Sequence, residues 1–443
     1  MFRLQQMFLV TLLIFLVNSV NGDSVEETLS TASPKSLPMP TSSPLLVFGI
    51  LTQPFYEDIS DVHGEPGGLR DRVDSDYNQT YVAASYVKWL EDGGARSIPI
   101  PFDASPSLVE DILGQVDGVL FPGGASSLPS SAISIWEQLH SEKYYYPIED
   151  DVLGDRIPLW GTCLGLEFII QLAADTTEKE DDYSFNREVL EKGYDSTNIS
   201  LPLLEVNRTG LYRPDSVYDI VTRYNVTMNN HHLGISPQRF RNNSGLSKRF
   251  DITSINYDRN GKAFVSTIEP SKRHAAELSS SSSSSSSSTN VTPIYGVQYH
   301  PEKNVHEYGL YPHTSIPYES IDHSPEGIAF SLYEARFLVD LARDNVLSKR
   351  KSTSITGERS RDNHDANKYN KPDLYPMIYT YPRRVGYKFE ESYIIPSASH
   401  WERETNNEKN NADDHNVEER GKDLVNIKKE ATNAMLRRKS RGL

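Results

Sequence analysis

The one cysteine of this 443-residue chain, Cys163, stands in a pattern typical of a reactive nucleophile. The pattern is Gly161-Thr162-Cys163-Leu164-Gly165, and it lies between an apolar segment that predicts a strand and another that predicts a helix. A Gly-x-nucleophile-x-Gly turn of this kind holds the reactive side chain in a strained, exposed position. The start of the following helix would favour a thiolate there. The alternative is an ordinary buried cysteine.

A thiol nucleophile needs a base, and the best candidate among the 12 histidines is His300, in Tyr299-His300-Pro301-Glu302. It follows a predicted strand, so its ring would project from the edge of a sheet. Glu302, two residues later, can turn back and bond the second ring nitrogen. Taken alone, the motif also fits a histidine at the surface. Together with the cysteine turn it predicts a Cys-His-Glu triad.

An oxyanion hole is the third part of this chemistry. Phe121-Pro122-Gly123-Gly124 ends a predicted strand with two glycines, whose backbone N–H groups can approach a ligand closely. The Leu164 amide, at the start of the helix after the cysteine, is the natural second donor. We therefore predict an oxyanion hole formed by Gly124 and Leu164, with a plain tight turn at the glycines as the alternative.

The elements that must position these motifs alternate along the chain. Short apolar runs predict strands and spaced apolar residues predict helices. We expect strands at 45–51, 95–100, 118–121, 157–160, 263–268, 294–299, 377–381 and 393–395, and helices at 81–90, 107–113, 327–345 and in the segment beginning at 168. Strands separated by helices of this length predict an α/β fold with a parallel sheet covered on both faces.

Composition divides the chain into one large domain with appendages. Residues 1–22 read as a signal peptide, because the apolar run from Met7 to Val17 is shorter than the roughly 20 residues of a membrane anchor, the alternative. We expect a flexible leader at 23–43, the domain at 44–396 and a disordered charged tail at 397–443. Residues 279–288 form an unbroken serine tract, which we expect to be a loop insertion.

The net charge and the modification sites indicate which compartment and which partners to expect. The net charge of −16 repels nucleic acid, so we expect no nucleic-acid partner. We expect no membrane association after signal cleavage, and passage through the secretory pathway to the extracellular space or to a lysosome or vacuole. The chain carries Asn-x-Ser/Thr sequons, which predict glycosylation of exposed loops, at Asn78, Asn198, Asn207, Asn225, Asn242 and Asn290.

The motifs stand in an order that resembles the gamma-glutamyl hydrolases, the folate polyglutamate hydrolases of peptidase family C26, within the class I glutamine amidotransferase-like superfamily. They are Pro122-Gly123-Gly124, the cysteine turn and the segment from Gly296 to Lys303, and the similarity covers roughly residues 44 to 396. The resemblance implies a three-layer αβα sandwich around a mostly parallel central sheet. It also implies hydrolysis of the gamma-glutamyl bonds of folylpoly-gamma-glutamates, or of other gamma-glutamyl peptides, through a thioester on Cys163, with no cofactor and no metal.

The resemblance also suggests residues that contact the substrate: Glu167, Tyr86, Lys303 and, in Asn230-His231-His232, His232 rather than His231. A solvated charge is the alternative for Lys303. Amidotransferases typically have Gln at the fourth position after the cysteine, where Glu167 stands here. An amidotransferase subunit and a non-catalytic secreted binding module remain as alternative functions, and a homodimer is compatible with the sequence.

Overall fold

The computed structural model describes residues 45–54, 79–141, 157–176, 188–271, 292–311, 313–355, 375–385 and 389–399, with side chains up to residue 347 of the long helix. The predicted signal peptide, the leader, the serine tract and the charged tail after Ser399 lie outside the described residues. Asn78 and Asn290 lie outside them as well. The domain limits and the properties of these segments therefore stay predictions.

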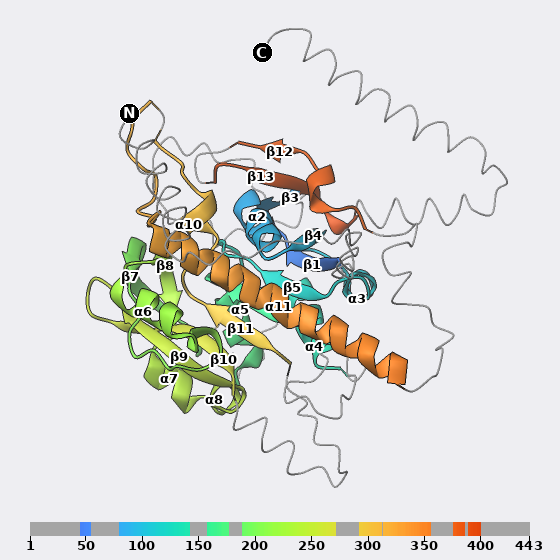
Figure 1. Cartoon of the computed structure of the whole chain (residues 1–443), viewed down its shortest axis with the longest axis horizontal. Coiled ribbons are helices and arrows are strands. Elements are labelled where there is room, and N and C mark those ends of the chain that lie inside the picture. The colour runs from blue at the N-terminus through green and yellow to red at the C-terminus, as the bar shows by residue number, and fades with distance from the viewer. Residues whose placement is uncertain are drawn as a thin grey trace, which may run out of the picture. The chain divides into compact units, whose positions relative to one another are not determined.

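A seven-stranded sheet forms the centre of the fold (Figure 1). Its order is β4 (Ala95–Ile100), β1 (Leu46–Leu51), β5 (Gly118–Phe121), β6 (Leu159–Thr162), β11 (Ile294–Val297), β10 (Ala263–Pro270) and β9 (Phe250–Tyr257). The pairings from β4 to β11 are parallel, and β10 and β9 are antiparallel. Near-continuous apolar strands such as β1 and β5 are typical of sheets that are covered on both faces. The prediction of an α/β fold with a mostly parallel sheet is confirmed.

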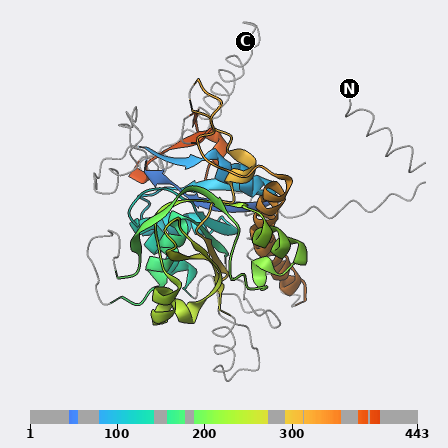
Figure 2. The same ribbon diagram turned by 90° about the vertical axis from the view of Figure 1, so that its left-hand side faces the viewer.

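Two groups of helices pack with this sheet. One group consists of α2 (Ala84–Asp92), α6 (Asp215–Arg223), α10 (Lys303–His306) and α11 (Pro325–Ile355). The other consists of α3 (Pro106–Leu113), α4 (Ser130–Leu139), α5 (Leu164–Ala173), α7 (Pro237–Asn242) and α8 (Ser244–Arg249). Figure 2 shows the brown ribbon of α11 on one side of the sheet and teal helices of the second group on the other. These layers make the three-layer sandwich.

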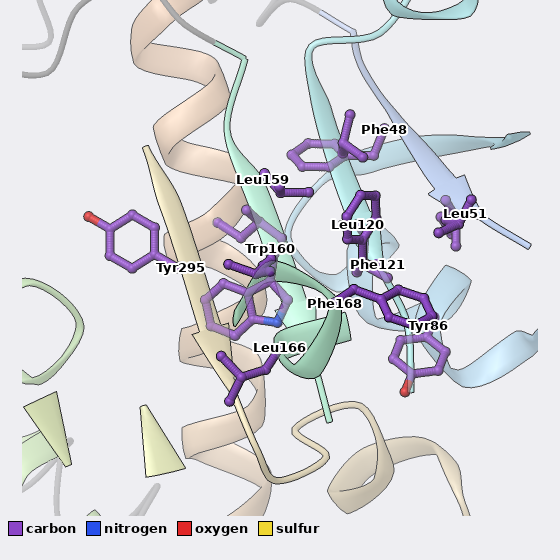
Figure 3. Close-up of a cluster of buried hydrophobic side chains, with 14 of the residues drawn as sticks. Phe48, Leu51, Tyr86, Leu120, Phe121, Leu159, Trp160, Leu166, Phe168 and Tyr295 are labelled. Carbon is purple, nitrogen blue, oxygen red and sulfur yellow. The ribbon is translucent and has the colours of Figure 1, made fainter. Parts of the chain in front are cut away.

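The core lies between the central strands and these helices (Figure 3). Phe121 of β5 meets Phe168 of α5 edge to face, with ring centroids 6.4 Å apart. On the other side of β6, the rings of Trp160 and Trp89 are 5.6 Å apart. Aromatic pairs in such arrangements add to the free energy gained from burial alone. The strands that end at the site are therefore held from both faces.

Two smaller sheets complete the described part of the chain. The antiparallel order β12 (Arg383–Arg384), β13 (Ser392–Pro396), β3 (Gln79–Ala83) and β2 (Gln53–Pro54) extends from the end of β1. The pair β7 (Glu191–Leu201) and β8 (Thr227–Gly234) stands apart from it. Short 3-10 turns occur at η2 (Gly210–Tyr212) and η3 (Ile378–Thr380). In the described ranges, no helix has both the length and the apolar character to cross a membrane.

Several predicted elements are corrected. The predicted helix 81–90 starts only at Ala84, because residues 79–83 pair as strand β3 with β13 and β2. The predicted strand 377–381 contains the 3-10 turn η3, and the prolines at 376 and 382 disfavour a ladder there. The strand predicted at 157–160 lies at Leu159–Thr162, and α11 is longer than the predicted 327–345. The apolar pattern does not predict strands β2, β7, β8, β9 and β12.

Candidate active site

Cys163 occupies the turn between β6 and α5 with strained backbone angles, φ 51° and ψ −105°. A non-glycine residue at positive φ is uncommon and marks a functional turn when the surrounding structure enforces it. The flanking glycines permit this tight turn, because no larger residue would fit at either position. A Cβ atom at Gly165 would stand 2.1 Å from the carbonyl oxygen of Phe121, and one at Gly161 would stand 2.7 Å from that of Gly165. The turn has the geometry of a nucleophile elbow.

The thiol is buried, although the sequence pattern predicts an exposed one. Cys163 is only 5% exposed, and its sulfur accepts a hydrogen bond from Gln298 Nε2 at 3.8 Å. Burial raises the pKa of the Cys163 thiol, and the nearby Glu167 carboxylate raises it further, against the lowering effects of Lys303 and of the Leu164 amide. The helix start therefore does act on the sulfur as expected, but it does not produce a resting thiolate. Attack by this thiol requires a base.

His300 and Glu302 form a buried pair at the same edge of the sheet as Cys163. The pairing of β6 with β11 is parallel, and the Cys163 amide donates to the Val297 carbonyl at 2.8 Å, so the ends of the two strands lie side by side. His300 Nδ1 lies 2.8 Å from Glu302 Oε1, and Glu302 has no exposed surface. An Nδ1–H that donates to this carboxylate leaves Nε2 free to accept a proton.

Tyr86 links this pair to the glycine turn after β5. The Gly123 amide donates to Tyr86 Oη at 2.7 Å, and the same oxygen lies 3.3 Å from His300 Nδ1. Burial and the Glu302 carboxylate raise the pKa of Tyr86, so its hydroxyl keeps its proton. Tyr86 is 2% exposed, and this placement favours a supporting role over the predicted contact with substrate.

The two predicted oxyanion donors remain free of backbone partners. Tyr86 engages the Gly123 amide, whereas the Gly124 amide has no hydrogen bond to any residue in the described ranges. The Leu164 amide is directed at the Cys163 sulfur, whose pKa it lowers. Gly124 also lies against Gln53, since a Cβ atom there would stand 2.5 Å from Gln53 Oε1. The assignment of Gly124 and Leu164 to an oxyanion hole stays a prediction.

Lys303 is neither solvated nor free to bind a carboxylate in this structure. It is 3% exposed, and its ammonium donates to both oxygens of Glu319 at 2.5 and 2.6 Å. Burial alone would lower the pKa of Lys303, but Glu319 and Glu302 outweigh this effect and raise it. Asn230 Nδ2 adds a hydrogen bond of 2.7 Å to Glu319. The ion pair lies close to the catalytic residues, because the charge of Lys303 lowers the pKa of the Cys163 thiol and the charge of His300 lowers the pKa of Glu319.

The two histidines of β8 point to opposite sides of the strand. His231 is 4% exposed, while His232 is exposed and lies 3.2 Å through its Nδ1 from the Tyr194 carbonyl oxygen. Burial lowers the pKa of His231 to about 3, with a further lowering from the charge of His300. Alternation along a strand separates such neighbours. The structure therefore favours His231 over the predicted His232 at the site, and contact of either histidine with substrate stays a prediction.

Glu167 lies beneath the nucleophile. It is 2% exposed, and its Oε1 accepts from Gln298 Nε2 at 3.3 Å. Gln298, Glu319, Asn230 and Gln53 were missed in the sequence analysis. Gln298 lies in the segment from Gly296 to Lys303 and Asn230 stands next to His231, which were usable signals, whereas Glu319 comes from a segment without a local motif.

Two further results concern ligands and modification. The described ranges contain no group of three or more His, Cys, Asp or Glu side chains that is placed to hold a metal ion. The sequon asparagines in those ranges are all exposed, at Asn198, Asn207, Asn225 and Asn242. Their glycosylation stays a prediction.

The fold and the site define the class of this protein. A thiol on a strained strand-to-helix turn, with a His-Glu pair at the end of the neighbouring parallel strand, is typical of α/β cysteine hydrolases of the glutamine amidotransferase-like type. The family model of peptidase C26 matches residues 68–302, and the chain belongs to this family.

Several curated relatives are similar over most of their length. Gamma-glutamyl hydrolase B of Dictyostelium discoideum is 29% identical over 354 residues, which is 79% of this chain and 81% of the relative. Gamma-glutamyl hydrolase of Mus musculus is 32% identical over 60% of this chain and 72% of its own. The Homo sapiens enzyme of that name is 30% identical over 62% of this chain and 75% of its own.

Proposed function

We propose that this protein is a cysteine-dependent hydrolase that cleaves gamma-glutamyl peptide bonds through a thioester on Cys163. One observation carries the proposal: the chain's only cysteine sits on the strained turn of a C26 peptidase, beside a buried His300–Glu302 pair. The relatives named gamma-glutamyl hydrolase support the choice of bond. Folylpoly-gamma-glutamates are the substrates that we propose.

In the acylation step, the Cys163 thiol gives its proton to His300 while the sulfur bonds to the gamma-carbonyl carbon. The amides of Gly124 and Leu164 receive the developing oxyanion. Collapse of this intermediate breaks the C–N bond, and the His300 imidazolium protonates the departing amine. A gamma-glutamyl thioester remains. Because burial raises the pKa of the thiol, proton transfer to His300 must accompany attack.

Deacylation uses the same residues in the opposite direction. Water gives a proton to His300 as it attacks the thioester carbonyl, the C–S bond breaks, and the sulfur regains its proton. Glu302 keeps the ring oriented and stabilises the imidazolium in both steps through the contact at Nδ1. The shortened folyl-gamma-glutamate is released as a free acid, since the glutamate or gamma-linked glutamate peptide has already left as the amine in the acylation step.

The test is product analysis on defined substrates. Purified protein is incubated with a folate that carries a gamma-linked oligoglutamate chain, with its alpha-linked isomer, and with glutamine. Mass spectrometry should find shortened chains only from the gamma-linked compound. Release of ammonia from glutamine with no cleavage of gamma-linked chains would favour an amidotransferase instead, and no reaction with any of the three would favour a binding module.

We further propose that the protein passes through the secretory pathway and works outside the cell or in a lysosome or vacuole. The apolar N-terminal segment and the sequons motivate this proposal, and the exposure of Asn198, Asn207, Asn225 and Asn242 is compatible with glycans. Expression of the full chain in eukaryotic cells tests it. A mass decrease on glycosidase treatment is expected, and an unglycosylated product that retains residues 1–22 would contradict it.

A further inference from the structure

A buried series of hydroxyl groups lies behind the catalytic segment and ends on a carboxyl group of α11. Ser254 Oγ donates to Thr267 Oγ1 at 2.8 Å, and Thr267 Oγ1 lies 2.6 Å from Tyr212 Oη. Tyr212 Oη lies 3.0 Å from Tyr299 Oη, which donates to Glu334 Oε1 at 2.6 Å. Because Ser254 donates to Thr267, each hydroxyl that follows can accept one hydrogen bond and donate the next, which directs the Tyr299 hydroxyl to Glu334. Glu334 is the terminal acceptor.

Helix α11 contacts the segment that carries the catalytic pair on both sides of His300. Tyr299, one residue before His300, donates to Glu334, and Ser331 Oγ donates to the carbonyl of Pro301, one residue after it, at 2.5 Å. The Phe330 and Tyr299 rings also pack, with centroids 6.1 Å apart. The orientation of the His300 ring therefore depends on side chains of α11 that touch neither the ring nor the thiol.

The Glu334 carboxyl group has surroundings that suit an uncharged acid. It has no exposed surface, its Oε2 has no hydrogen-bond partner, and no Lys, Arg or His of the described residues is among the groups that act on its pKa. Burial raises the pKa of Glu334 well above its ordinary value, and the Glu302 carboxylate raises it further. A buried carboxylate without a cation is strongly unfavourable. Of Glu302 and Glu334, Glu302 is the residue that contacts His300.

We propose that Glu334 is a positioning residue that works as a neutral acid: it holds Tyr299, and with it the His300–Glu302 segment, without placing a second negative charge near Glu302. This inference rests on the proposed function only for its kinetic readout. A protonated carboxyl can accept from Tyr299 with one oxygen and carry its proton on the other. A glutamine at this position would offer the same acceptor and an N–H donor, so Glu334→Gln is the conservative variant.

The test compares Glu334→Gln with Glu334→Leu in the full-length protein. Cys163 is the only cysteine, so the pH dependence of its alkylation by iodoacetamide, which forms a C–S bond and releases iodide, reports on the thiol without a gamma-glutamyl substrate. We expect Glu334→Gln to leave the pH midpoint of alkylation unchanged and to keep kcat within about twofold of the wild-type value. Glu334→Leu should lower kcat by about tenfold or more with little change in KM. Glu334→Leu should also move the alkylation midpoint to higher pH.

Two variants separate positioning from stability. Leu338→Ala removes a fully buried apolar group one turn along α11 and should lower the melting temperature while leaving the alkylation midpoint unchanged. Tyr299→Phe removes the hydroxyl that meets Glu334 and should shift the midpoint in the same direction as Glu334→Leu. It decides the question if Glu334→Leu does not fold.

Three results would overturn the proposal. An equal loss of kcat and an equal shift of the alkylation midpoint in Glu334→Gln and Glu334→Leu would mean that an ionised carboxylate is needed. A folded Glu334→Leu protein with the wild-type alkylation profile would mean that Glu334 only fills space, and a wild-type profile in Tyr299→Phe would mean that Tyr299 transmits nothing. Because alkylation does not depend on the substrate, a wrong assignment of the hydrolysed bond would leave these outcomes readable.

Discussion

Cys163 is subject to two opposing influences. The positive φ of the turn and the Leu164 amide favour a reactive sulfur, whereas burial and the carboxylate of Glu167 raise the pKa of the thiol. A thiol that stays protonated at rest is protected from oxidation and alkylation, which proceed through the thiolate. Glu167, which is conspicuous in the sequence only as a departure from the amidotransferase pattern, is thus placed to restrain the nucleophile.

Replacing Glu167 by Gln should make the thiol more reactive. The amide keeps an acceptor for Gln298 but removes the negative charge, so the pKa of Cys163 should fall. We expect alkylation by iodoacetamide at pH 7 to accelerate by up to about tenfold, the change that one pKa unit produces. His232→Gln, a change at an exposed position, is the control and should leave the rate unaltered. A slower reaction in Glu167→Gln would contradict this account of the electrostatics.

Among the individual residues of the site, the sequence predicts contacts between residues that are close along the chain and misses contacts between residues that are close only in space. His300 and Glu302 are two residues apart, and their contact follows from local spacing. The choice between His231 and His232 needs the register of β8, a strand that the apolar pattern did not indicate. Glu319 pairs with Lys303 from a loop 16 residues away, and no local motif marks it.

The elements of the site are two strand ends and the turns that follow them. The glycine turn after β5 approaches the catalytic histidine so closely that a Cβ atom at Gly123 would stand 2.5 Å from His300 Cε1 and 2.8 Å from Tyr86 Oη. Both atoms belong to buried side chains, so neither can move away freely. The glycine is needed here for space.

Gly123→Ala should therefore displace the His300 ring. A shift of about 1 Å in a catalytic group can lower kcat by about 10²-fold, so we expect a loss of that order. Gly114→Ala is the matched control, because a Cβ atom there would meet only ordinary contacts at 3.4 Å, and it should keep full activity. Steady-state kinetics with a gamma-linked substrate measures both. Wild-type kcat in Gly123→Ala would show that the turn tolerates a side chain and would contradict the geometry.

Elements with strong local patterns were predicted well, and elements defined by tertiary pairing were not. The apolar runs of β1, β4 and β5 were found within a residue, because buried parallel strands are continuously hydrophobic. Residues 81–83 follow the helical spacing of Tyr81 to Leu90, yet they form strand β3, because β2 and β13 pair with them. The pairing with β13 involves residues more than 300 positions away, which no local pattern reveals.

In the whole molecule, acidic residues outnumber basic ones, and several of the acidic residues lie near the site. Glu302, Glu307 and Glu319 are all nearly buried, and Lys303 is the buried cation among them. Glu307 Oε2 accepts from the Glu390 amide at 3.0 Å and so ties the segment before β13 to α10. Burial, with a contribution from Glu302, raises the pKa of Glu307 from 4.5 to about 7.

This shift predicts that stability falls as pH rises from 4.5 to about 7. Over that range the unfolded chain releases the Glu307 proton while the folded protein keeps it, so the folded state loses free energy relative to the unfolded state. The full effect is at most about 3.5 kcal/mol, since one pKa unit corresponds to about 1.4 kcal/mol. Glu307→Gln should remove this part of the decline, which urea unfolding at several pH values measures.

The control is Glu137→Gln, which changes an exposed glutamate of α4 and should follow the wild-type curve. Parallel curves for Glu307→Gln and the wild type would contradict the assignment. A protein with this dependence is more stable in mildly acidic surroundings, which agrees with the proposed lysosomal or vacuolar location.

The overall architecture was predictable because alternating strands and helices leave few topologies for a parallel sheet. The antiparallel extension by β10 and β9 was not, because the apolar pattern did not indicate β9, the strand that pairs with β10.

The central claim is that Cys163 is the nucleophile that cleaves gamma-glutamyl bonds. Its most direct test is the rate of gamma-linked oligoglutamate hydrolysis by Cys163→Ala, with circular dichroism and thermal unfolding to establish that the variant folds. We predict a folded protein whose kcat falls by at least about 10³-fold, because no other thiol exists in the chain to replace it. Hydrolysis by folded Cys163→Ala at a rate near that of the wild type would contradict the account.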